Sequence, residues 1–397
     1  MISSRIAKKL GAGAAPIRAA FNEAERQRAL YGSDAVYDLS IGNPGAPMDA
    51  AVRDAIRETA LSMEEHGYMC EAGYEWVRAN IAASLSKRFG TPYSAGEIVM
   101  TAGAAGALNA VLCALLDAGD EVVVIRPYYP PYVSFIENWG GVPIAADSDL
   151  SDFQPDFASL KKKITRRTKA VIVNSPNNPS GAVYTRETAE RMSELLKNCG
   201  KRYGTDIYLI SDEPYRELVY TGEELPVWAE YYGDSLMVYS FSKSLSLAGE
   251  RIGYAAVSPY SRRAAELTSA IRAAIGVCGY VNAPAFFQGV VGKCADIAPN
   301  LNFYTENRRL LYSKLLETGF DAQEPQGAFY IFVKSPLPSE RDFIEAAARR
   351  HLIFVGGSAF GCPGYARLSF CGKRSVISGA MKALELLAGD CGLRGGL

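Results

Sequence analysis

The sequence has little histidine and no paired cysteine motif. Its 397 residues include two histidines, His66 and His351, and eight scattered cysteines, none of them arranged as CxxC. Zinc sites and disulfide frameworks depend on such clusters, so we predict no metal site. Isolated cysteines are typical of small buried residues in a reducing compartment.

An excess of charge and a long apolar run are also missing. The formal net charge is −1, whereas nucleic-acid-binding proteins carry a basic surface. The one basic run, "KKKITRRTK" at 161–169, is typical of a solvated helix end before a strand. No apolar run approaches a membrane span, and "MISSRIAKKLGAGAAPIRAAF" lacks the apolar core of a signal peptide. We therefore expect a cytoplasmic protein with neither a nucleic-acid nor a membrane partner.

The residues that are present favour a large α/β fold. Hydrophobic residues make up 48% of the chain, enough for a sizeable core. Helical patterns are expected over 16–30, over 49–118 with an interruption at 66–74, and over 185–199. Short, nearly continuous apolar runs indicate a mainly parallel sheet with helices on both faces. The expected strands are 121–125, 170–174, 207–211, 236–241 and 251–257.

The pattern changes near residue 295. One long helix is expected over 295–320, followed by shorter strands and helices up to the C-terminus. We predict a large α/β domain over 51–295. The remaining segments, 1–50 and 296–397, would form a smaller α/β domain built from both ends of the chain.

Polar side chains follow four of the expected strands. Tyr129 follows 121–125, and Asn178 follows 170–174. Asp212 follows 207–211, and Lys243 follows 236–241. Each alone has an ordinary explanation, such as a turn residue or a helix cap. Because ligands in open parallel sheets bind beyond the carboxyl ends of the strands, the set together predicts one site.

A lysine at a strand end suggests a covalent cofactor. Its amine can form a Schiff base with the aldehyde of pyridoxal 5'-phosphate, which serves as an electron sink. Such a site needs a carboxylate beside the pyridine nitrogen, for which Asp212 is the candidate. Asn178 and Tyr215 can donate to the phenolic oxygen, and the Tyr129 ring can stack on the pyridine.

The cofactor phosphate needs hydroxyls, a cation and backbone amides. Ser240, Ser242 and Arg251 supply the first two. The segment "TAGAAGALNAV" at 101–111 is a small-residue turn running into a helix, whose N–H groups can face an anion. It is neither a P-loop nor a GxGxxG motif, and a tight helix–sheet packing turn explains it equally well.

Five motifs in order resemble one family. "SFSKSLSLAGERIGY" resembles the SxxK-x5-G-x-R-x-G signature of class I/II aminotransferases, the fold type I pyridoxal-phosphate enzymes. "GYMCEAGYEWVRANIA", "NSPNNPSG", "SDEPY" and "YARLSF" resemble other segments of that family, over about residues 37–370. The resemblance implies a large domain with a mainly parallel, seven-stranded-type sheet, a smaller α/β domain and a homodimer with shared active sites.

The resemblance also assigns roles to residues. It implies that Lys243 forms the Schiff base and carries the proton, with Asp212 and Tyr215 as the other catalytic residues. Tyr68 would reach the phosphate of the neighbouring subunit. The substrate α-carboxylate would be held by Arg367, with Gly42 and Asn178. Cofactor binding is implied for Gly103, Ala104, Ala105, Tyr129, Asn178, Asp212, Tyr215, Ser240, Ser242, Lys243, Arg251 and Tyr68.

The implied activity moves an amino group from an L-amino acid to a 2-oxo acid. Acidic substrates stay open, because "GVCGYVNAP" lacks the basic residue that one dicarboxylate-specific subgroup uses and Arg272 lies further upstream. Three alternatives are kept. They are a β-lyase of the cysteine–sulfur lyase type, a non-catalytic binding protein on this fold, and a nicotinamide dehydrogenase, for which the glycine fingerprint is missing.

Overall fold

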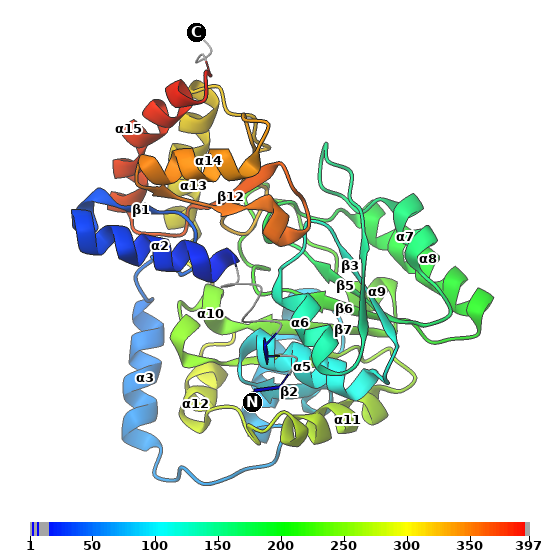
Figure 1. The fold of residues 1–397 in the computed structure, drawn as a ribbon. Coiled ribbons are helices and arrows are strands. Elements are labelled where there is room, and N and C mark those ends of the chain that lie inside the picture. The colour runs from blue at the N-terminus through cyan, green and yellow to red at the C-terminus, as the bar shows by residue number, and fades with distance from the viewer. Residues whose placement is uncertain (1, 4–5, 8–15, 394–397) are drawn as a thin grey trace.

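The computed structural model describes residues 2–3, 6–7 and 16–393, and a seven-stranded sheet lies at its centre (Figure 1). The strand order is β2-β8-β7-β6-β5-β3-β4. Strand β8 runs antiparallel to both of its neighbours, and the other neighbouring pairs are parallel, which confirms the predicted mainly parallel sheet. The strands are β2 (Ile98–Thr101), β3 (Glu121–Ile125), β4 (Val142–Ala146), β5 (Thr168–Asn174), β6 (Tyr208–Asp212), β7 (Ser235–Ser240) and β8 (Gly253–Val257).

Helices cover both faces of this sheet. Because side chains alternate along a strand, Val122 and Val124 pack into one cluster with α5 (Gly103–Leu115), α6 (Pro131–Asn138) and α11 (Ala264–Val277). Val123 and Ile125 pack on the other face with α7 (Phe157–Lys163) and α8 (Arg186–Tyr203). The β2 end is covered by α3 (Ala50–Ser62), α4 (Glu75–Phe89) and α12 (Ala285–Lys293). Two one-turn helices, α9 (Trp228–Tyr231) and α10 (Phe241–Ser244), flank β7.

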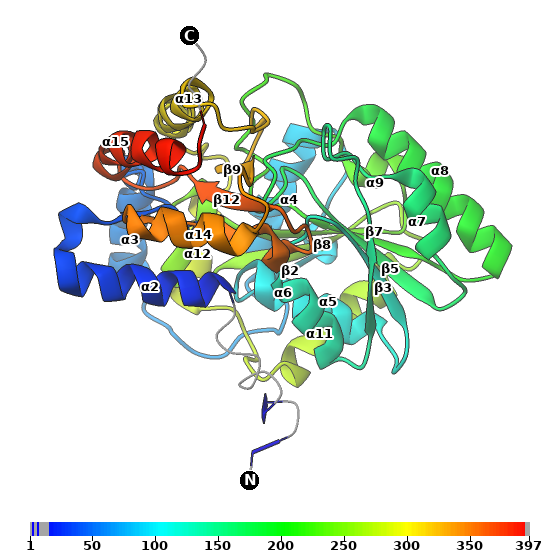
Figure 2. The same ribbon diagram turned by 45° about the horizontal axis from the view of Figure 1, so that its top comes forward.

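A second group of elements combines both ends of the chain (Figure 2). Strand β1 (Tyr37–Asp38) pairs in parallel with β10 (Leu352–Ile353). An antiparallel sheet has the order β11 (Val355–Gly356), β12 (Tyr365–Ser369), β9 (Tyr330–Lys334). The surrounding helices are α2 (Pro16–Tyr31), α13 (Leu301–Glu317), α14 (Glu340–Arg349) and α15 (Arg374–Asp390). The domain boundaries at 51 and 295 stay a prediction.

Two expected helical segments are wrong in part. The segment 49–118 contains strand β2 at Ile98–Thr101, whose four residues are all buried. A run this short and uniformly apolar has no periodicity that distinguishes strand from helix. The helix expected from 295 begins at Leu301, because the Asn300 side chain accepts a hydrogen bond from the Phe303 amide and caps it there. The short elements β4, α6 and α7 were not predicted individually.

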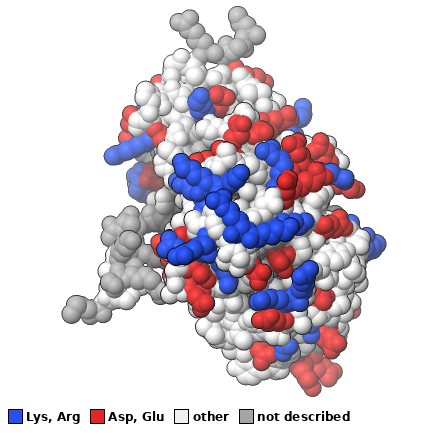
Figure 3. Space-filling model, turned by 90° about the vertical axis from the view of Figure 1, so that its right-hand side faces the viewer, with Lys and Arg blue, Asp and Glu red and all other residues white. Residues whose placement is uncertain are grey.

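The basic run lies where the sequence placed it. Lys161, Lys162 and Lys163 form the last turn of α7, and β5 begins at Thr168. Figure 3 views the side of the molecule that carries α7 and α8 and shows basic side chains interspersed with acidic ones. Arg167, for example, lies 2.6 Å from Glu121. The run is therefore a charged, solvated helix end.

The prediction of buried, unpaired cysteines is correct in part. All eight are free, but four are buried, three are half-buried and Cys70 is exposed. Within the described ranges, no cluster of three or more histidine, cysteine or acidic side chains could hold a metal ion. None of the helices in that part of the chain combines the length and apolar character needed to cross a membrane.

Candidate active site

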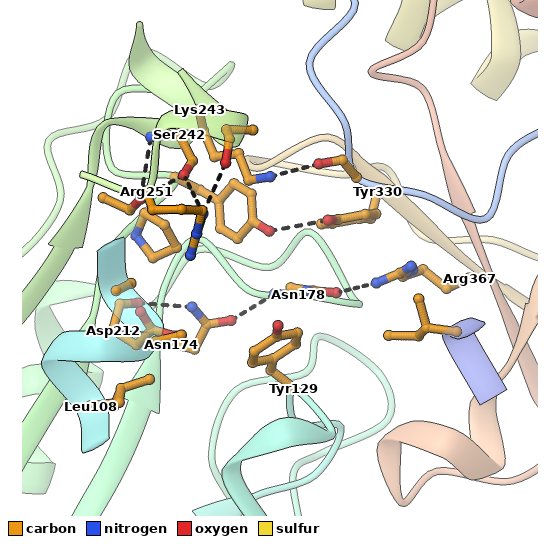
Figure 4. A pocket seen from close by; sticks show the side chains of 18 residues that line it. Leu108, Tyr129, Asn174, Asn178, Asp212, Ser242, Lys243, Arg251, Tyr330 and Arg367 are labelled. Carbon is orange, nitrogen blue, oxygen red and sulfur yellow. Dashed lines mark hydrogen bonds between the residues drawn. The ribbon is translucent and has the colours of Figure 1, made fainter. Parts of the chain in front are cut away.

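A cavity of about 250 Å³ lies at the carboxyl ends of β5, β6 and β7 (Figure 4). The sequence-predicted residues that line it are Gly42, Ala104, Ala105, Tyr129, Asn178, Asp212, Tyr215, Ser240, Ser242, Lys243, Arg251 and Arg367. It is also lined by Ile17, Leu108, Asn174, Pro214, Ala248 and Tyr330. Of the predicted residues, Gly103 and Tyr68 do not line it.

Lys243 enters the cavity from the one-turn helix α10. The Ser240 hydroxyl accepts a hydrogen bond from the Ser242 amide and so caps this helix where β7 ends. The Lys243 ammonium donates to the Gly42 carbonyl at 2.6 Å. Burial lowers the pKa of Lys243 to about 8, because the charged form loses hydration. The amine is therefore mostly charged near physiological pH, but it releases its proton more easily than an exposed lysine does.

One end of the cavity collects hydroxyls and a cation. The Ser240 hydroxyl donates to the Ser242 hydroxyl at 2.8 Å, and Arg251 donates to the same hydroxyl at 3.5 Å. The first turn of α5 adds Ala104 and Ala105 to the lining. A free N–H group of such a turn, with the helix dipole, favours an anion.

Gly103 makes this close approach possible from just outside the cavity. Its φ of +72° is favourable only for glycine, and a Cβ there would lie 2.8 Å from the Arg251 Nη2. The small-residue turn thus brings the guanidinium against the start of α5. The sequence left two interpretations of the "GAAG" turn open, a tight packing turn and a helix N-terminus that faces an anion. In the structure the turn packs tightly against Arg251 and also places the start of α5 at the cavity.

Asp212 ends β6 and is buried. One of its carboxylate oxygens, Oδ2, accepts a hydrogen bond from the Tyr132 hydroxyl at 2.5 Å. The other, Oδ1, has no partner among the described atoms. Burial raises the pKa of Asp212 to about 7, and the Tyr132 hydrogen bond opposes that shift. A buried carboxylate oxygen without a donor is a place for a ligand N–H.

The opposite end of the cavity is formed by Arg367 of β12. Its guanidinium donates to the Asn178 Oδ1 at 2.9 Å and to the Ser40 carbonyl at 2.5 Å. It lies over the rings of Tyr330 and Phe360, 4.4 and 4.9 Å from their centroids. No ion pair among the described residues includes Arg367, although it is only 2% exposed. A buried guanidinium without a carboxylate is a binding site for an anionic group.

Between these ends, hydrogen bonds tie the strand ends together. The Tyr215 and Tyr330 hydroxyls are 3.1 Å apart. Asn174, the last residue of β5, donates to the Asp212 carbonyl at 2.8 Å and accepts from the Asn178 amide at 2.8 Å. The result is a cavity with cations at both ends and a carboxylate and hydroxyls along its wall.

The comparisons with known proteins decide the family. Residues 34–384 match the family described as aminotransferase class I and II. The chain belongs to this family. It is therefore an enzyme of the transaminase type, as the motifs predicted, and neither a dehydrogenase nor a non-catalytic binding protein.

Individual relatives cover nearly the whole chain. An aspartate aminotransferase from Thermotoga maritima is 32% identical over 367 residues, which is 91% of this chain and 94% of the relative. A probable aspartate/prephenate aminotransferase from Aquifex aeolicus is 33% identical, covering 87% and 91%. The crystal structure of an aminotransferase from Eubacterium rectale is 40% identical with a TM-score of 0.94, covering 98% and 99%. These likenesses confirm the fold type I architecture.

Among the residues that sequence reasoning missed, three make hydrogen bonds at or beside the cavity. Tyr132 lies three residues after Tyr129, in the first turn of α6, and its place beside the predicted stacking residue is the one local signal for it. Asn174 is the last residue of an expected strand, which is the same signal that identified Asp212. Tyr330 lies inside the apolar run "AFYIFV" and has no local signal. Its hydroxyl occupies the space that a Cβ on Gly42 would need.

Two residues named from the sequence lie away from this cavity. Tyr68 is 94% exposed and belongs to the stretch between α3 and α4. Its role at a neighbouring subunit stays a prediction. Arg272 lies in α11, where its guanidinium is 3.3 Å from Glu71. It does not line the cavity within one chain.

Proposed function

We propose that the cavity binds pyridoxal 5'-phosphate and transfers an amino group from an L-amino acid to a 2-oxo acid. One observation carries the proposal. Within the described part of the chain, the same cavity holds a buried Asp212 oxygen without a donor, a buried Arg367 without a carboxylate, and a lysine whose pKa is lowered to about 8. The N–H of a protonated aromatic ring would bond the Asp212 oxygen, and the carboxylate of an amino acid would pair with Arg367. An aldehyde would react with the lysine.

The residues present fit the parts of this cofactor. Ser240, Ser242, Arg251 and the start of α5 would hold the phosphate. Asp212 would accept a hydrogen bond from the ring nitrogen through Oδ1, which has no partner among the described atoms. The predicted roles of Asn178 and Tyr215 at the phenolic oxygen and of Tyr129 on the ring face are also part of the proposal. Gly103 and Gly42 provide backbone where side chains would collide.

Lys243 and Arg367 have separate roles in the proposed reaction. When bound, the cofactor supplies an electron sink that stabilises negative charge on the substrate carbon next to the amine. Lys243 would hold the cofactor through its Nζ, and the same amine would accept and return a proton during the reaction. A pKa of about 8 suits an amine that must both accept and return a proton near neutral pH. Arg367 orients the substrate by its α-carboxylate.

The relatives' names narrow the substrates to be tested first. Several are aspartate or aspartate/prephenate aminotransferases, so aspartate is our first amino donor, with 2-oxo acids as acceptors. The β-lyase alternative has no observation in its favour. A homodimer with shared sites, the two-domain division at 51 and 295, and a cytoplasmic location complete the proposal.

Chemical trapping tests the cofactor assignment. The protein is incubated with pyridoxal 5'-phosphate, reduced with borohydride, digested and mapped by mass spectrometry. We expect the pyridoxyl label on Lys243 and none in Lys243→Ala, whereas Lys293→Ala, changed at the end of α12, is labelled like the parent. A label on another lysine would contradict the site.

A substrate panel tests the reaction. Aspartate and several other amino acids are supplied with and without a 2-oxo acid acceptor, and 2-oxo acid formation is measured. Sustained turnover that depends on the acceptor is expected of a transaminase. Sustained release of a 2-oxo acid and ammonia without acceptor would instead identify a lyase.

A further inference from the structure

Tyr132 is the one side chain in the described structure that hydrogen-bonds the Asp212 carboxylate. It lies in the first turn of α6, where Pro130 and Pro131 lead the chain into the helix and its amide donates to the Tyr129 carbonyl at 3.1 Å. The Tyr132 side chain is 2% exposed, and its ring packs edge-on against Tyr129 with centroids 5.5 Å apart. Its position is therefore set by packing on several sides.

The proton of this hydrogen bond stays on the tyrosine. Burial and the neighbouring carboxylate both raise the pKa of Tyr132, so its hydroxyl does not ionise in the working pH range. The hydroxyl bonds the Oδ2 of Asp212. The Oδ1 of the same carboxylate has no partner among the described residues, and Asp212 lines the cavity.

We propose that Tyr132 is a positioning residue, which orients Asp212 with one oxygen free for the cofactor's ring nitrogen and keeps that carboxylate ionised. This inference rests on the proposed function. Tyr132 itself does not line the cavity. It acts only through Asp212, which distinguishes it from the stacking residue Tyr129.

The other charged groups near Asp212 do not replace this donor. The adjacent Glu213 raises the pKa of Asp212, and its own carboxylate is bonded by Arg216 and Ser211. The backbone carbonyl of Asp212, not its carboxylate, takes the Asn174 amide. The titratable groups that pack near Asp212 or share its cavity are Tyr129, Tyr132, Glu213, Tyr215, Lys243, Arg251, Tyr330 and Arg367.

Loss of the hydroxyl has a predictable sign. The buried Asp212 has a pKa raised to about 7, and the Tyr132 bond lowers it. Tyr132→Phe removes a hydrogen bond to a charged group, so the pKa rises further, by about one to two units. Asp212 is then protonated over a wider pH range and no longer pairs with a protonated ring nitrogen.

The test uses pyridoxine 5'-phosphate, an alcohol that cannot bond covalently to Lys243. Its dissociation constant is measured by calorimetry from pH 5.5 to 9.5 for the full-length cofactor-free protein. The pH at which affinity falls on the acid side should move upward by about one to two units in Tyr132→Phe. The ¹⁵N chemical shift of the labelled ring nitrogen should move toward the unprotonated form.

The matched control is Tyr232→Phe. Tyr232 is also a buried tyrosine with a hydrogen-bonding hydroxyl, but it donates to the Ile207 carbonyl at 2.6 Å and lies away from the cavity. It should lose comparable stability and keep the parent's pH midpoint and ¹⁵N shift. If Tyr132→Phe binds with the parent's midpoint and shift, Tyr132 only contributes to packing and the inference is overturned.

A second variant covers the case in which Tyr132→Phe does not fold. Site-specific incorporation of 3-fluorotyrosine at position 132 keeps the size of the ring and makes the hydroxyl a stronger donor. The midpoint should then move downward, and an unchanged midpoint would also overturn the inference. If the parent protein fails to bind pyridoxine 5'-phosphate at any pH, the proposed function itself fails.

Discussion

At the scale of single residues, the site is defined by charges that the fold does not balance. Asp212 and Arg367 are buried and Lys243 is half-buried, and for none of them does the described structure include an opposite charge in an ion pair. Burying such groups costs stability, which proteins accept mainly where a ligand will bind. Substitutions of Arg367 and Lys243 test this view.

Arg367→Lys should weaken every substrate together. Lysine keeps a positive charge but not the planar pair of donors, and it cannot reproduce the stack between the rings of Tyr330 and Phe360. We expect kcat/KM to fall for donors and acceptors alike, by about 2–5 kcal/mol of transition-state stabilisation, with cofactor affinity nearly unchanged. Steady-state kinetics with two unlike amino acids and one 2-oxo acid measure this. A loss confined to one substrate would place Arg367 at a side-chain subsite.

Lys243 should make the cofactor-free protein's stability depend on pH. Its pKa is about 8 when folded and near 10.4 when unfolded, so the unfolded chain binds more protons between these values. Its contribution is therefore most unfavourable below about pH 8 and improves toward pH 10, by about 1.4 kcal/mol per pH unit at most. In urea unfolding, Lys243→Met should be more stable than the parent at pH 7, with the difference shrinking by pH 10. A difference that is constant with pH would contradict the lowered pKa.

At the scale of elements, the site depends on where strands end and one helix begins. Strands β5, β6 and β7 are neighbours in the sheet, so Asn174, Asp212 and Ser240 at their ends share one edge. Helix α5 starts close to that edge, directly after β2. The turn between β2 and α5 is therefore as important as any side chain in the cavity.

Gly103→Ala should reduce cofactor affinity by displacing Arg251. The added Cβ would lie 2.8 Å from the Arg251 Nη2, and the residue would keep a strained φ of +72°. Gly119→Ala is the control, because Gly119 has a φ of +92° but no atom within 4 Å of the place that a Cβ would take. Both variants should lose roughly 1 kcal/mol or more of unfolding free energy from backbone strain. Only Gly103→Ala should also show a higher dissociation constant for pyridoxal 5'-phosphate in equilibrium dialysis.

At the scale of the whole molecule, the cavity joins segments from the full length of the chain. Gly42 comes from the N-terminal part, Lys243 from the one-turn helix after β7 of the central sheet, and Arg367 from the C-terminal antiparallel sheet. Lys243 contacts the first of these segments directly through the Gly42 carbonyl. The active site thus forms only when the segments that flank the large sheet are folded against it.

Tyr68 allows the proposed homodimer with shared active sites to be tested. If it completes the site of a neighbouring subunit, Lys243→Ala and Tyr68→Phe chains that are each inactive should regain partial activity when unfolded, mixed and refolded. One site of each mixed dimer then has both residues intact. Mixing Lys243→Ala with Tyr31→Phe, changed at another exposed tyrosine, should add no activity beyond that of Tyr31→Phe itself. A fully active monomer in light scattering would exclude the shared site.

The sequence by itself determined five strands of the seven-stranded sheet and most of the cavity lining. Continuous apolar runs predicted the central strands, and parallel strands necessarily share one carboxyl edge. Lys243, Asp212 and Asn178 could therefore be brought together without coordinates. The needs of a phosphate group suggested Arg251, the family resemblance implied Arg367, and the family match bears out the class of enzyme. These features depend on local patterns within a few residues of each other.

Only the tertiary structure decided how the charged groups are held. Tyr132 bonds Asp212 across 80 positions of sequence, and the Arg367 guanidinium bonds the Ser40 carbonyl across 327. Tyr330 and Phe360 come from different elements to enclose that guanidinium. Contacts between distant segments depend on packing geometry, and no periodicity or spacing in the chain records which side chains will meet.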